Sequence, residues 1–334
     1  MTALQWHAVD LGIEEMPEIR ALFAQVFGHS MSDALWRWKY DAGRGIATGT
    51  RDEQGRLLAH YGGTARALQV NGVAVSAVQL GDVMVAAQAR GILSRRGPFA
   101  TAATAFLQHH IGSPGAYALG FGFPNQRHTR LGEKLGLYNA LGNVQELSWT
   151  CEKTRTSLFF GADSHSTPLD WSDARTDNLL NGLWRALSQD ARGFVIPRRD
   201  APWWRHRFAN HPEGPYRCWW VHGRWSRRLL GAIALKPGGQ PGANWEILDL
   251  LGPTKHWHAM LCAARLLAQQ GAADRLTGWF SDAVADIVRS QDVGSIAASQ
   301  VACPHCVTRQ RSPEWADVVT AQPWWLTGGD TDFR

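Results

Sequence analysis

The sequence lacks a long apolar run. No stretch of about 18 uncharged apolar residues is present, and a helix that spans a membrane needs at least that length. The first residues also lack a basic segment followed by an apolar one, so we expect no secretory leader. The five cysteines are odd in number and widely scattered, which argues against a disulfide framework and for a reducing compartment. We therefore expect a cytoplasmic protein without a membrane span.

An excess of one charge is also lacking. The chain has 34 Lys+Arg against 29 Asp+Glu, for a formal net charge of +5. For 334 residues this excess is too small to indicate a nucleic-acid-binding surface, so we expect no nucleic-acid partner. The charge suits an anionic small ligand, and arginine rather than the scarce lysine supplies most of it.

The residues that are present suffice for two folded domains. Apolar residues make up 45% of the chain and charged residues 19%, which is ordinary for a folded protein. A length of 334 residues corresponds to about two domains of common size. We expect most of the seventeen tryptophans in cores or in the walls of clefts.

The first half alternates helical and extended patterns, which indicates an α/β (α+β) fold with a mixed sheet. Apolar residues recur at helical spacing over residues 16–27 and predict a helix. The Asn71-Gly72 pair lies between two apolar segments and predicts a hairpin. The other expected elements are strands at 4–9, 57–61, 65–70, 73–79, 81–85 and 116–121 and helices at 99–110 and 125–135.

The second half repeats parts of the first, which favours a duplicated domain over two unrelated α/β domains of similar composition. A polar segment rich in Gly, Pro and Asp separates the halves, so we expect domains at residues 1–150 and 172–334 with a linker at 151–171. Three features recur at nearly constant spacing: the aromatic and basic segments Trp36–Tyr40 and Trp204–Phe208, the strands with Asp82 and Asp249, and the helices that begin near Phe99 and His258.

A basic, glycine-containing loop leads from a strand into the helix that begins after Pro98. Free N–H groups at the start of a helix favour an anion, and proline suits its first turn because it lacks an N–H. Arginine side chains nearby add charge-assisted bonds to phosphate oxygens. The loop predicts a pyrophosphate site, and the alternative is a basic surface loop without a ligand. Its relevant residues are Arg90, Gly91, Arg95, Arg96 and Gly97.

These residues resemble the coenzyme A motif of the GNAT acyltransferase superfamily, in which a strand leads into Arg-Gly-x-Gly-x-Gly/Ala. Arg90-Gly91 matches directly, and Arg96-Gly97-Pro98-Phe99 completes the pattern if residues 92–95 are an insertion. The segment 125–137 has the spacing of the family's second motif, with Asn125 and Gly136 matching in kind. Gly132 stands where the family usually has the tyrosine that protonates the departing thiolate.

The resemblance implies two GNAT-like domains in tandem, each a mixed, mostly antiparallel sheet flanked by helices. It implies acetyl-CoA or another acyl-CoA as co-substrate, no metal, and direct attack by an amine in a ternary complex. Asp82 is then the candidate general base and Tyr138 the candidate acid. The alternatives are a carboxylate that bonds a neighbouring loop or arginine and an ordinary core-edge tyrosine. The implied cofactor-binding residues are Val83, Met84, Val85, Arg90, Gly91, Arg95, Arg96, Gly97, Phe99 and Asn125.

Other candidate sites are weaker. The segment after Asp249 has no Arg-Gly-x-Gly equivalent, so we expect the second domain to be degenerate and to bind no coenzyme A. Cys303 and Cys306 form one pair, whereas structural zinc usually needs two, so we expect no metal there. The aromatic cluster at 36–40 either lines an acceptor cleft or packs a helix end, and its repetition favours packing. At the C-terminus we expect Trp324 and Trp325 to dock on a domain and Asp330 and Asp332 to face the cleft.

Three functions fit these observations. The first is N-acyl transfer from acyl-CoA to the amine of a small molecule or peptide. The second is transfer of amino acids from tRNA to cell-wall or polysaccharide precursors, as in the Fem-type transferases, which also pair two GNAT-like domains. The third is binding of acyl-CoA or of a partner protein without turnover, which Gly132 and Phe99 favour because both depart from the family pattern.

Overall fold

A computed structural model describes residues 6–92, 96–113, 115–151, 164–240, 242–291, 296–331 and 333. The chain divides into two compact units. The first contains Met1–Ala67, Val75–Leu141 and Cys303–Ala321, and the second contains Leu68–Ala74, Gly142–Ala302 and Gln322–Arg334. Residues 303–321, which the sequence placed with the second domain, thus belong to the first unit. No helix among the described residues is long and apolar enough to cross a membrane.

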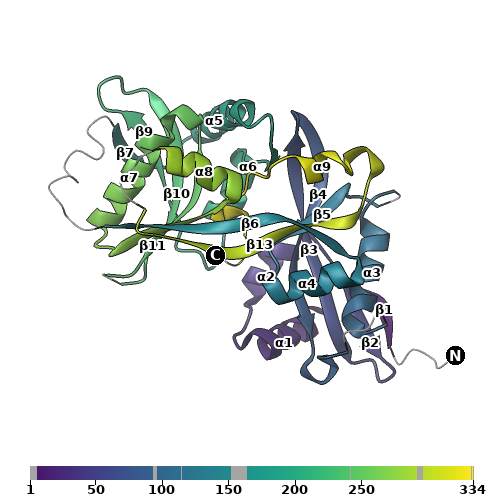
Figure 1. The fold of residues 1–334 in the computed structure, drawn as a ribbon. Helices are drawn as coiled ribbons and strands as arrows, with labels where there is room; N and C mark the ends of the chain where they lie inside the picture. Colours follow the sequence, from purple (N-terminus) through teal and green to yellow (C-terminus); the bar gives the residue numbers. More distant parts are fainter. Residues whose placement is uncertain are drawn as a thin grey trace. The chain divides into compact units, whose positions relative to one another are not determined.

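The first unit is a mixed sheet with helices packed against it (Figure 1). The first three strands pair antiparallel, whereas the fourth and fifth pair parallel. The strands, in sheet order, are β1 (Trp6–Leu11), β2 (Gly45–Asp52), β3 (Leu57–Val70), β4 (Val73–Val85) and β5 (Leu119–Gly122). The helices are α1 (Met16–Phe27), α2 (Asp33–Tyr40), α3 (Pro98–His110) and α4 (Gln126–Leu135).

Local sequence signals account for much of this unit. The helix predicted at residues 16–27 is confirmed, and it ends at Gly28, whose φ of 77° suits glycine. The hairpin is confirmed as well: Asn71 and Gly72 have φ of 51° and 83°, as a type I′ turn requires. The expected strands at 57–61 and 65–70 form one continuous strand, β3, and those at 73–79 and 81–85 form β4.

Two apolar clusters cover the two faces of this sheet. One contains Tyr61 of β3 and Phe106 of α3, whose ring centroids lie 5.0 Å apart. The other contains residues of α1 and α2, among them Tyr40, whose ring lies 6.1 Å from that of His60. His60 and Tyr61 are neighbours on β3, so the alternation along a strand sends their side chains to opposite faces.

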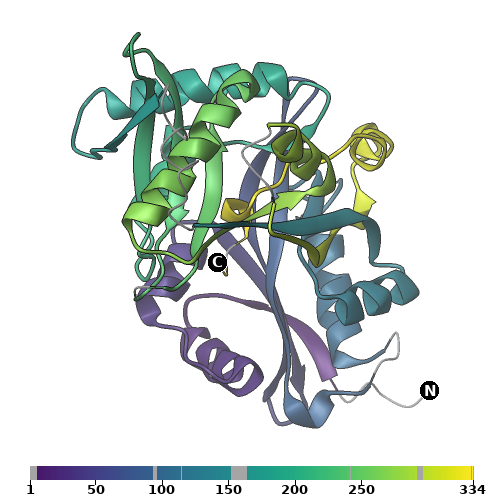
Figure 2. The same ribbon diagram turned by 60° about the vertical axis from the view of Figure 1, so that its left-hand side comes forward.

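The second unit is also a mixed sheet flanked by helices, and Figure 2 shows α7 lying along its strands. The strands, in sheet order, are β6 (Tyr138–Thr150), β12 (Arg275–Ser281), β11 (Trp245–Leu251), β10 (Leu229–Lys236), β9 (Arg217–Gly223) and β7 (Ser164–Pro168), while β8 (Val195–Pro197) pairs with β3. The main helices are α5 (Thr176–Asp190), α6 (Ala201–Trp204), α7 (Trp257–Gln270) and α8 (Asp282–Ser290).

Apart from β8, which lies between α5 and α6 and has no counterpart between α1 and α2, the two units repeat one element order, as the internal sequence repeats indicate. Asp82 lies on β4 and Asp249 on β11, and each of these strands has a hairpin partner on one side and a parallel neighbour, β5 or β12, on the other. A helix follows each strand, α3 in one unit and α7 in the other.

Each unit also takes a strand segment from the other half of the sequence. In the first unit, β5 pairs antiparallel with part of β13 (Ala298–Arg311), from Cys306 to Arg311. In the second unit, β12 pairs antiparallel with residues 144–150 of β6. The last strands of the two repeats are therefore exchanged.

Candidate active site

The parallel pair β4–β5 ends before β4 does. Its paired residues run from Ala77 with Leu119 to Leu80 with Gly122, while β4 continues to Val85. The N–H of Ala86 donates to Leu58 of β3, so by alternation the N–H of Val85 points to the β5 side. The last residues of β4 thus present backbone groups at an edge where the pairing with β5 has ended.

Asp82 lies at the start of this segment and is held by α2 and β3. Its carboxylate accepts hydrogen bonds from Lys39 Nζ and Tyr40 Oη, both at 2.7 Å. Its carbonyl oxygen lies 2.7 Å from His60 Nδ1. Asp82 also has a φ of 49°, which is uncommon for a residue with a side chain, and these contacts hold it there.

The environment of Asp82 makes it a weak base. Burial alone would raise the pKa of Asp82, but the positive charge of Lys39 and the hydrogen bonds from Lys39 and Tyr40 lower it below its ordinary value. A proton acceptor of low pKa gives little driving force for removing a proton from an amine. The sequence did not predict that Lys39, Tyr40 and His60 contact Asp82. The only sequence signal was that Lys39 and Tyr40 lie in a short segment rich in aromatic residues.

Tyr138 lies beside Gly132, the residue found at the usual tyrosine position. The ring of Tyr138 packs so closely on Gly132 that a Cβ atom there would overlap it. The Tyr138 hydroxyl is hydrogen-bonded to the hydroxyl of Tyr61, and both rings are buried. Burial raises the pKa of Tyr138, so its hydroxyl stays protonated but is a weaker acid than that of an exposed tyrosine.

The start of α3 has the features expected of an anion site. Gly97 is its N-cap residue and Pro98 its first residue, and no side chain of the described residues caps it. Carbonyl contacts fix this end: the Trp6 indole donates to the Arg96 carbonyl, and Thr50 Oγ1 donates to the Pro98 carbonyl. The first N–H groups of α3 therefore remain available to a ligand.

The loop before α3 contains the basic residues and the glycine that the sequence singled out. Arg90 and Arg96 are exposed, and Arg90 Nε donates to the Val85 carbonyl at 3.1 Å. Gly91 has a φ of 94°, which a residue with a side chain rarely adopts. Arg95 lies outside the described residues.

Three other predicted cofactor residues have structural contacts. Asn125 caps α4, because its Oδ1 accepts a hydrogen bond from the His128 N–H at 2.9 Å. Phe99 lies against Tyr61, with ring centroids 6.2 Å apart. The Met84 side chain is buried in the core cluster under α1 and α2, so only its backbone is accessible to a ligand.

The described residues contain no group of three or more His, Cys, Asp or Glu arranged to hold a metal ion. Cys303 and Cys306 form no disulfide. Burial raises the pKa of Cys306 to about 11, which keeps it protonated near neutral pH.

Comparison with known proteins assigns this part of the chain. Residues 9–111 match the family described as acetyltransferase (GNAT) domain, a range that includes Asp82 and the loop before α3. Residues 9–111 are thus similar to a GNAT domain. No curated protein sequence matches it.

Solved structures extend the GNAT fold over most of the chain. A conserved protein of unknown function from Enterococcus faecalis, described as a probable N-acyltransferase, is 14% identical with a TM-score of 0.65, over 90% of this chain and 71% of that one. A GCN5-related N-acetyltransferase from Kribbella flavida is 16% identical with a TM-score of 0.62, over 90% and 70% of the two chains. N-myristoyltransferase from Saccharomyces cerevisiae with bound myristoyl-CoA is 9% identical with a TM-score of 0.52, over 93% and 84%.

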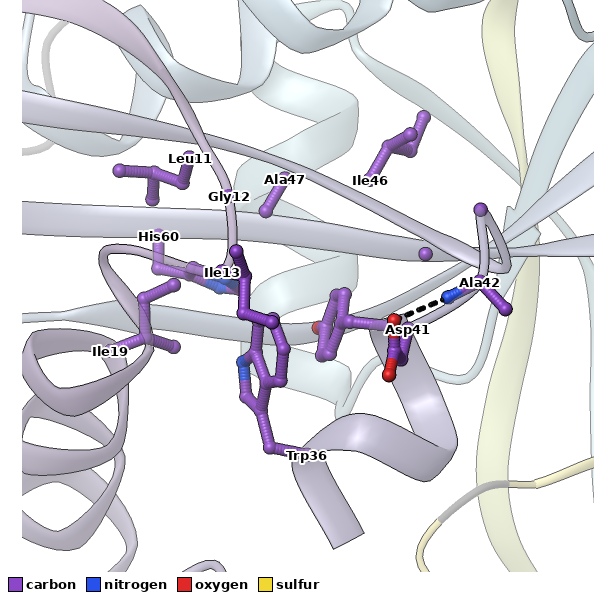
Figure 3. Close-up of a pocket in the computed structure, with 13 residues that line it drawn as sticks. Leu11, Gly12, Ile13, Ile19, Trp36, Asp41, Ala42, Ile46, Ala47 and His60 are labelled. Atoms are coloured by element: carbon purple, nitrogen blue, oxygen red, sulfur yellow. Dashed lines mark hydrogen bonds between the residues drawn. The ribbon is translucent and has the colours of Figure 1, made fainter. Parts of the chain in front are cut away.

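Within the GNAT domain, the aromatic cluster at residues 36–40 serves as packing. Trp36 is buried, points from α2 toward the strands (Figure 3) and stacks on Tyr40, with ring centroids 5.3 Å apart and 24° between the planes. Gly45 and Gly62 make room for Tyr40, since a Cβ atom at either would overlap its side chain. This packing holds the Tyr40 side chain in the position from which its hydroxyl donates to the Asp82 carboxylate.

Asp249, the residue of the second unit that corresponds to Asp82, is fully buried. Arg199 Nε lies 3.2 Å from Asp249, and its Nη2 pairs with Asp330, with all three side chains buried. Trp324 and Trp325 are buried, so the expected docking of the C-terminal segment is confirmed. Asp330 is buried in this ion-pair network rather than facing a cleft, and Asp332 lies outside the described residues.

Proposed function

We propose that the GNAT domain of the first unit transfers an acyl group from acyl-CoA to an amine. The observation that best supports this proposal is that the β4–β5 pairing ends at Leu80. Further along the chain, α3 begins at an uncapped N-terminus at Gly97, and the neighbouring Arg96 is exposed. Backbone groups of Val83–Val85 would bind the extended pantetheine chain and orient the thioester carbonyl. The helix start with Arg90, Gly91, Arg95 and Arg96 would bind the phosphates.

In this proposal the protein mainly positions the reactants. The acceptor nitrogen attacks the thioester carbon, the C–S bond breaks, the nitrogen loses a proton to solvent, and the departing thiolate takes up a proton. Tyr138 is the proposed donor of that proton, because it is protonated and packs beside Gly132. We propose that Asp82 holds the β4 backbone in place rather than acting as the base, since Lys39 and Tyr40 already occupy its carboxylate.

A second candidate is acyl-CoA binding without turnover. Two contacts favour it, because both candidate acid–base groups already have partners. Asp82 is ion-paired, and the Tyr138 hydroxyl is hydrogen-bonded to the hydroxyl of Tyr61. Release of free thiol from acetyl-CoA in the presence of a panel of amines separates the two candidates. Turnover supports transfer, whereas tight binding without thiol release supports the binding function.

The binding step is tested by calorimetric titration of acetyl-CoA. A charge-assisted contact to phosphate contributes about 1.5–3 kcal/mol, so Arg96→Ala should weaken binding roughly ten- to a hundredfold. Arg185→Ala is the matched control, because Arg185 is an exposed arginine on α5 of the second unit. Equal affinities of wild type and Arg96→Ala, or no binding to wild type, would contradict the proposal.

A further inference from the structure

The turn that joins β9 to β10 in the second unit combines basic side chains with one aromatic ring (Figure 1). We call residues 224–228 the basic turn. The chain has no acidic residue between Glu213 and Glu246, so neither flanking strand supplies a charge that would neutralise it. The residues of the basic turn, all of them exposed, are Arg224, Trp225, Ser226, Arg227 and Arg228.

Trp225 is the most exposed large apolar side chain among the described residues, at 85%. The Arg224 guanidinium lies over its ring, 5.9 Å from the ring centroid. An indole has a large apolar surface and one polar N–H, so it favours the boundary between water and an apolar phase. The exposed ring beside a cation therefore suits a surface that is both anionic and partly apolar.

The basic turn extends beyond the neighbouring strands. On one side β7 pairs with β9 only as far as Gly223, and on the other β11 pairs with β10 only from Ala232 onward. Residues 224–228 thus lie past the last paired residue of each neighbour. A projecting turn can meet a broad, flat surface without a matching groove.

Backbone contacts fix the shape of the turn. The Gly223 N–H donates to the Arg228 carbonyl at 2.9 Å, and the Arg227 N–H donates to the Gly223 carbonyl at 2.8 Å. Arg227 has a φ of 52°, a left-handed value that glycine or asparagine adopts more readily. Turn formation alone would favour one of those residues, so the arginine indicates a use for its charge.

Positive charge continues from the turn onto the loop after β11. This loop packs against the start of β10, since a Cβ atom at Gly252 would lie 2.9 Å from the Leu230 carbonyl oxygen. Burial lowers the pKa of His256, and the charges of Lys255 and Arg228 lower it further, so these three side chains lie near one another. Asp190 acts in the opposite direction, but its carboxylate already accepts two hydrogen bonds from Thr254.

We propose that the basic turn docks the protein reversibly on an anionic lipid surface, with the Trp225 indole in the interfacial layer and the arginines on lipid phosphates. Single-stranded nucleic acid would need several rings on which successive bases stack, and the turn has one. A protein partner would need an apolar patch, and the neighbours of Trp225 are charged or polar. The docking goes beyond acyl transfer, because it uses the second unit and needs no acyl-CoA.

The test is co-sedimentation of the intact protein with vesicles of phosphatidylcholine alone or of equal parts phosphatidylcholine and phosphatidylserine. Each arginine near an anionic leaflet strengthens binding about fivefold, so the three together predict roughly a hundredfold preference for the mixed vesicles. Added salt should weaken this binding, since it screens exposed charges. The vesicles contain no acyl-CoA, so this result and the acyl-transfer result can fail independently.

Exposed residues of the turn can be replaced without disturbing a core. Arg228→Ala should weaken binding to mixed vesicles about fivefold, and Trp225→Ala roughly tenfold or more. The matched controls are Arg185→Ala and Leu179→Ala, two exposed positions on α5 of the same unit, which should bind as wild type does.

Brominated lipid shows whether Trp225 itself enters the interface. Mixed vesicles with bromine on the acyl chains should quench part of the tryptophan fluorescence of wild type. Trp225→Phe keeps an aromatic anchor, so it should still bind, but most of this quenching should be lost.

Three results would overturn the proposal: no binding of wild type to mixed vesicles, wild-type binding by both Trp225→Ala and Arg228→Ala, or equal quenching of Trp225→Phe and wild type. A single-stranded oligonucleotide that binds more tightly than mixed vesicles, and loses its binding in Trp225→Ala, would overturn it as well and assign the basic turn to nucleic acid.

Discussion

The ring of Tyr138 fills the space beside the Cα atom of Gly132. In the related motif that helix position carries a tyrosine, and here a glycine leaves the room that a tyrosine six residues later takes up. The peptide N–H of Leu137 donates to the Gly132 carbonyl, which closes α4 and turns the chain so that Tyr138 comes back over the helix. The two positions are therefore coupled, and neither can be interpreted alone.

This coupling makes Tyr138 testable as the proton donor. If it protonates the departing thiolate, Tyr138→Phe should lower kcat by roughly 100- to 10,000-fold while the Kd for acyl-CoA changes little. Tyr61→Phe is the matched control, because it removes the same hydroxyl–hydroxyl bond from the other side. Steady-state kinetics of both variants decide the matter. Equal losses of kcat would show that the pair is structural and that Tyr138 is not the acid.

The packing of Tyr138 on Gly132 predicts a stability effect of its own. Gly132→Ala should destabilise the first unit by about 1–3 kcal/mol, since the added methyl group overlaps a buried ring that has little room to move. Gly182→Ala is the control: it is a helical glycine of α5 with nothing within 4 Å of the added atom, and it should stabilise by about 0.5–1 kcal/mol. The midpoints of urea unfolding measure both. A Gly132→Ala variant as stable as wild type would contradict the packing argument.

Replacing Lys39 should lower the free energy of unfolding far more than replacing Arg37, an exposed residue of the same helix. Lys39 and Asp82 form a buried ion pair, so Lys39→Met leaves a buried carboxylate without its cation and should cost about 3–5 kcal/mol. Arg37→Met removes the partner of exposed Asp41 and should change stability by less than about 1 kcal/mol. The double variant Lys39→Met/Asp82→Asn should regain part of the loss, because it also removes the stranded charge. Denaturant unfolding of the three variants provides the measurement.

Local sequence signals predicted the helices, strands and turns, but they did not predict which distant strands pair with each other. The 16–27 helix and the Asn71-Gly72 turn depend on periodicity and backbone preference within a few residues, so the sequence sufficed. The exchange of β6 and β13 depends on which sheet edge each strand meets, and two repeats with the same element order offer equivalent edges. Nothing within either strand distinguishes the two edges.

In the candidate active site, too, features formed by neighbouring residues could be predicted from the sequence, whereas contacts between distant residues could not. The helix start at Gly97 could be predicted because glycine, proline and arginine are adjacent in the chain. The contacts of Asp82 with Lys39, Tyr40 and His60 join residues about 20 to 40 positions apart, on three elements. Likewise the buried network of Arg199, Asp249 and Asp330 forms only because the C-terminal segment folds back onto β11. The sequence offered no signal for the second arrangement, and for the first only the short aromatic and basic segment at residues 36–40.

His60 predicts how the stability of the first unit depends on pH. Burial lowers its pKa and the nearby charge of Lys39 acts in the same direction, which together outweigh the hydrogen bond to the Asp82 carbonyl and the charge of Asp82. In the unfolded chain a histidine has a pKa of about 6.5. Between the lowered pKa and about 6.5 the unfolded state therefore binds a proton that the folded state does not, and the free energy of unfolding falls as the pH falls.

A glutamine at this position isolates the effect. Its amide can still donate to the Asp82 carbonyl but does not titrate, so His60→Gln should lose less stability than wild type between pH 7.5 and pH 5.5. The other histidines are common to both proteins, and their contributions cancel in the comparison. Urea unfolding at the two pH values provides the four free energies that are needed. If wild type and His60→Gln lose the same stability over this interval, the buried ring takes up a proton as readily as an unfolded one, and the argument that burial lowers the pKa of His60 would be wrong.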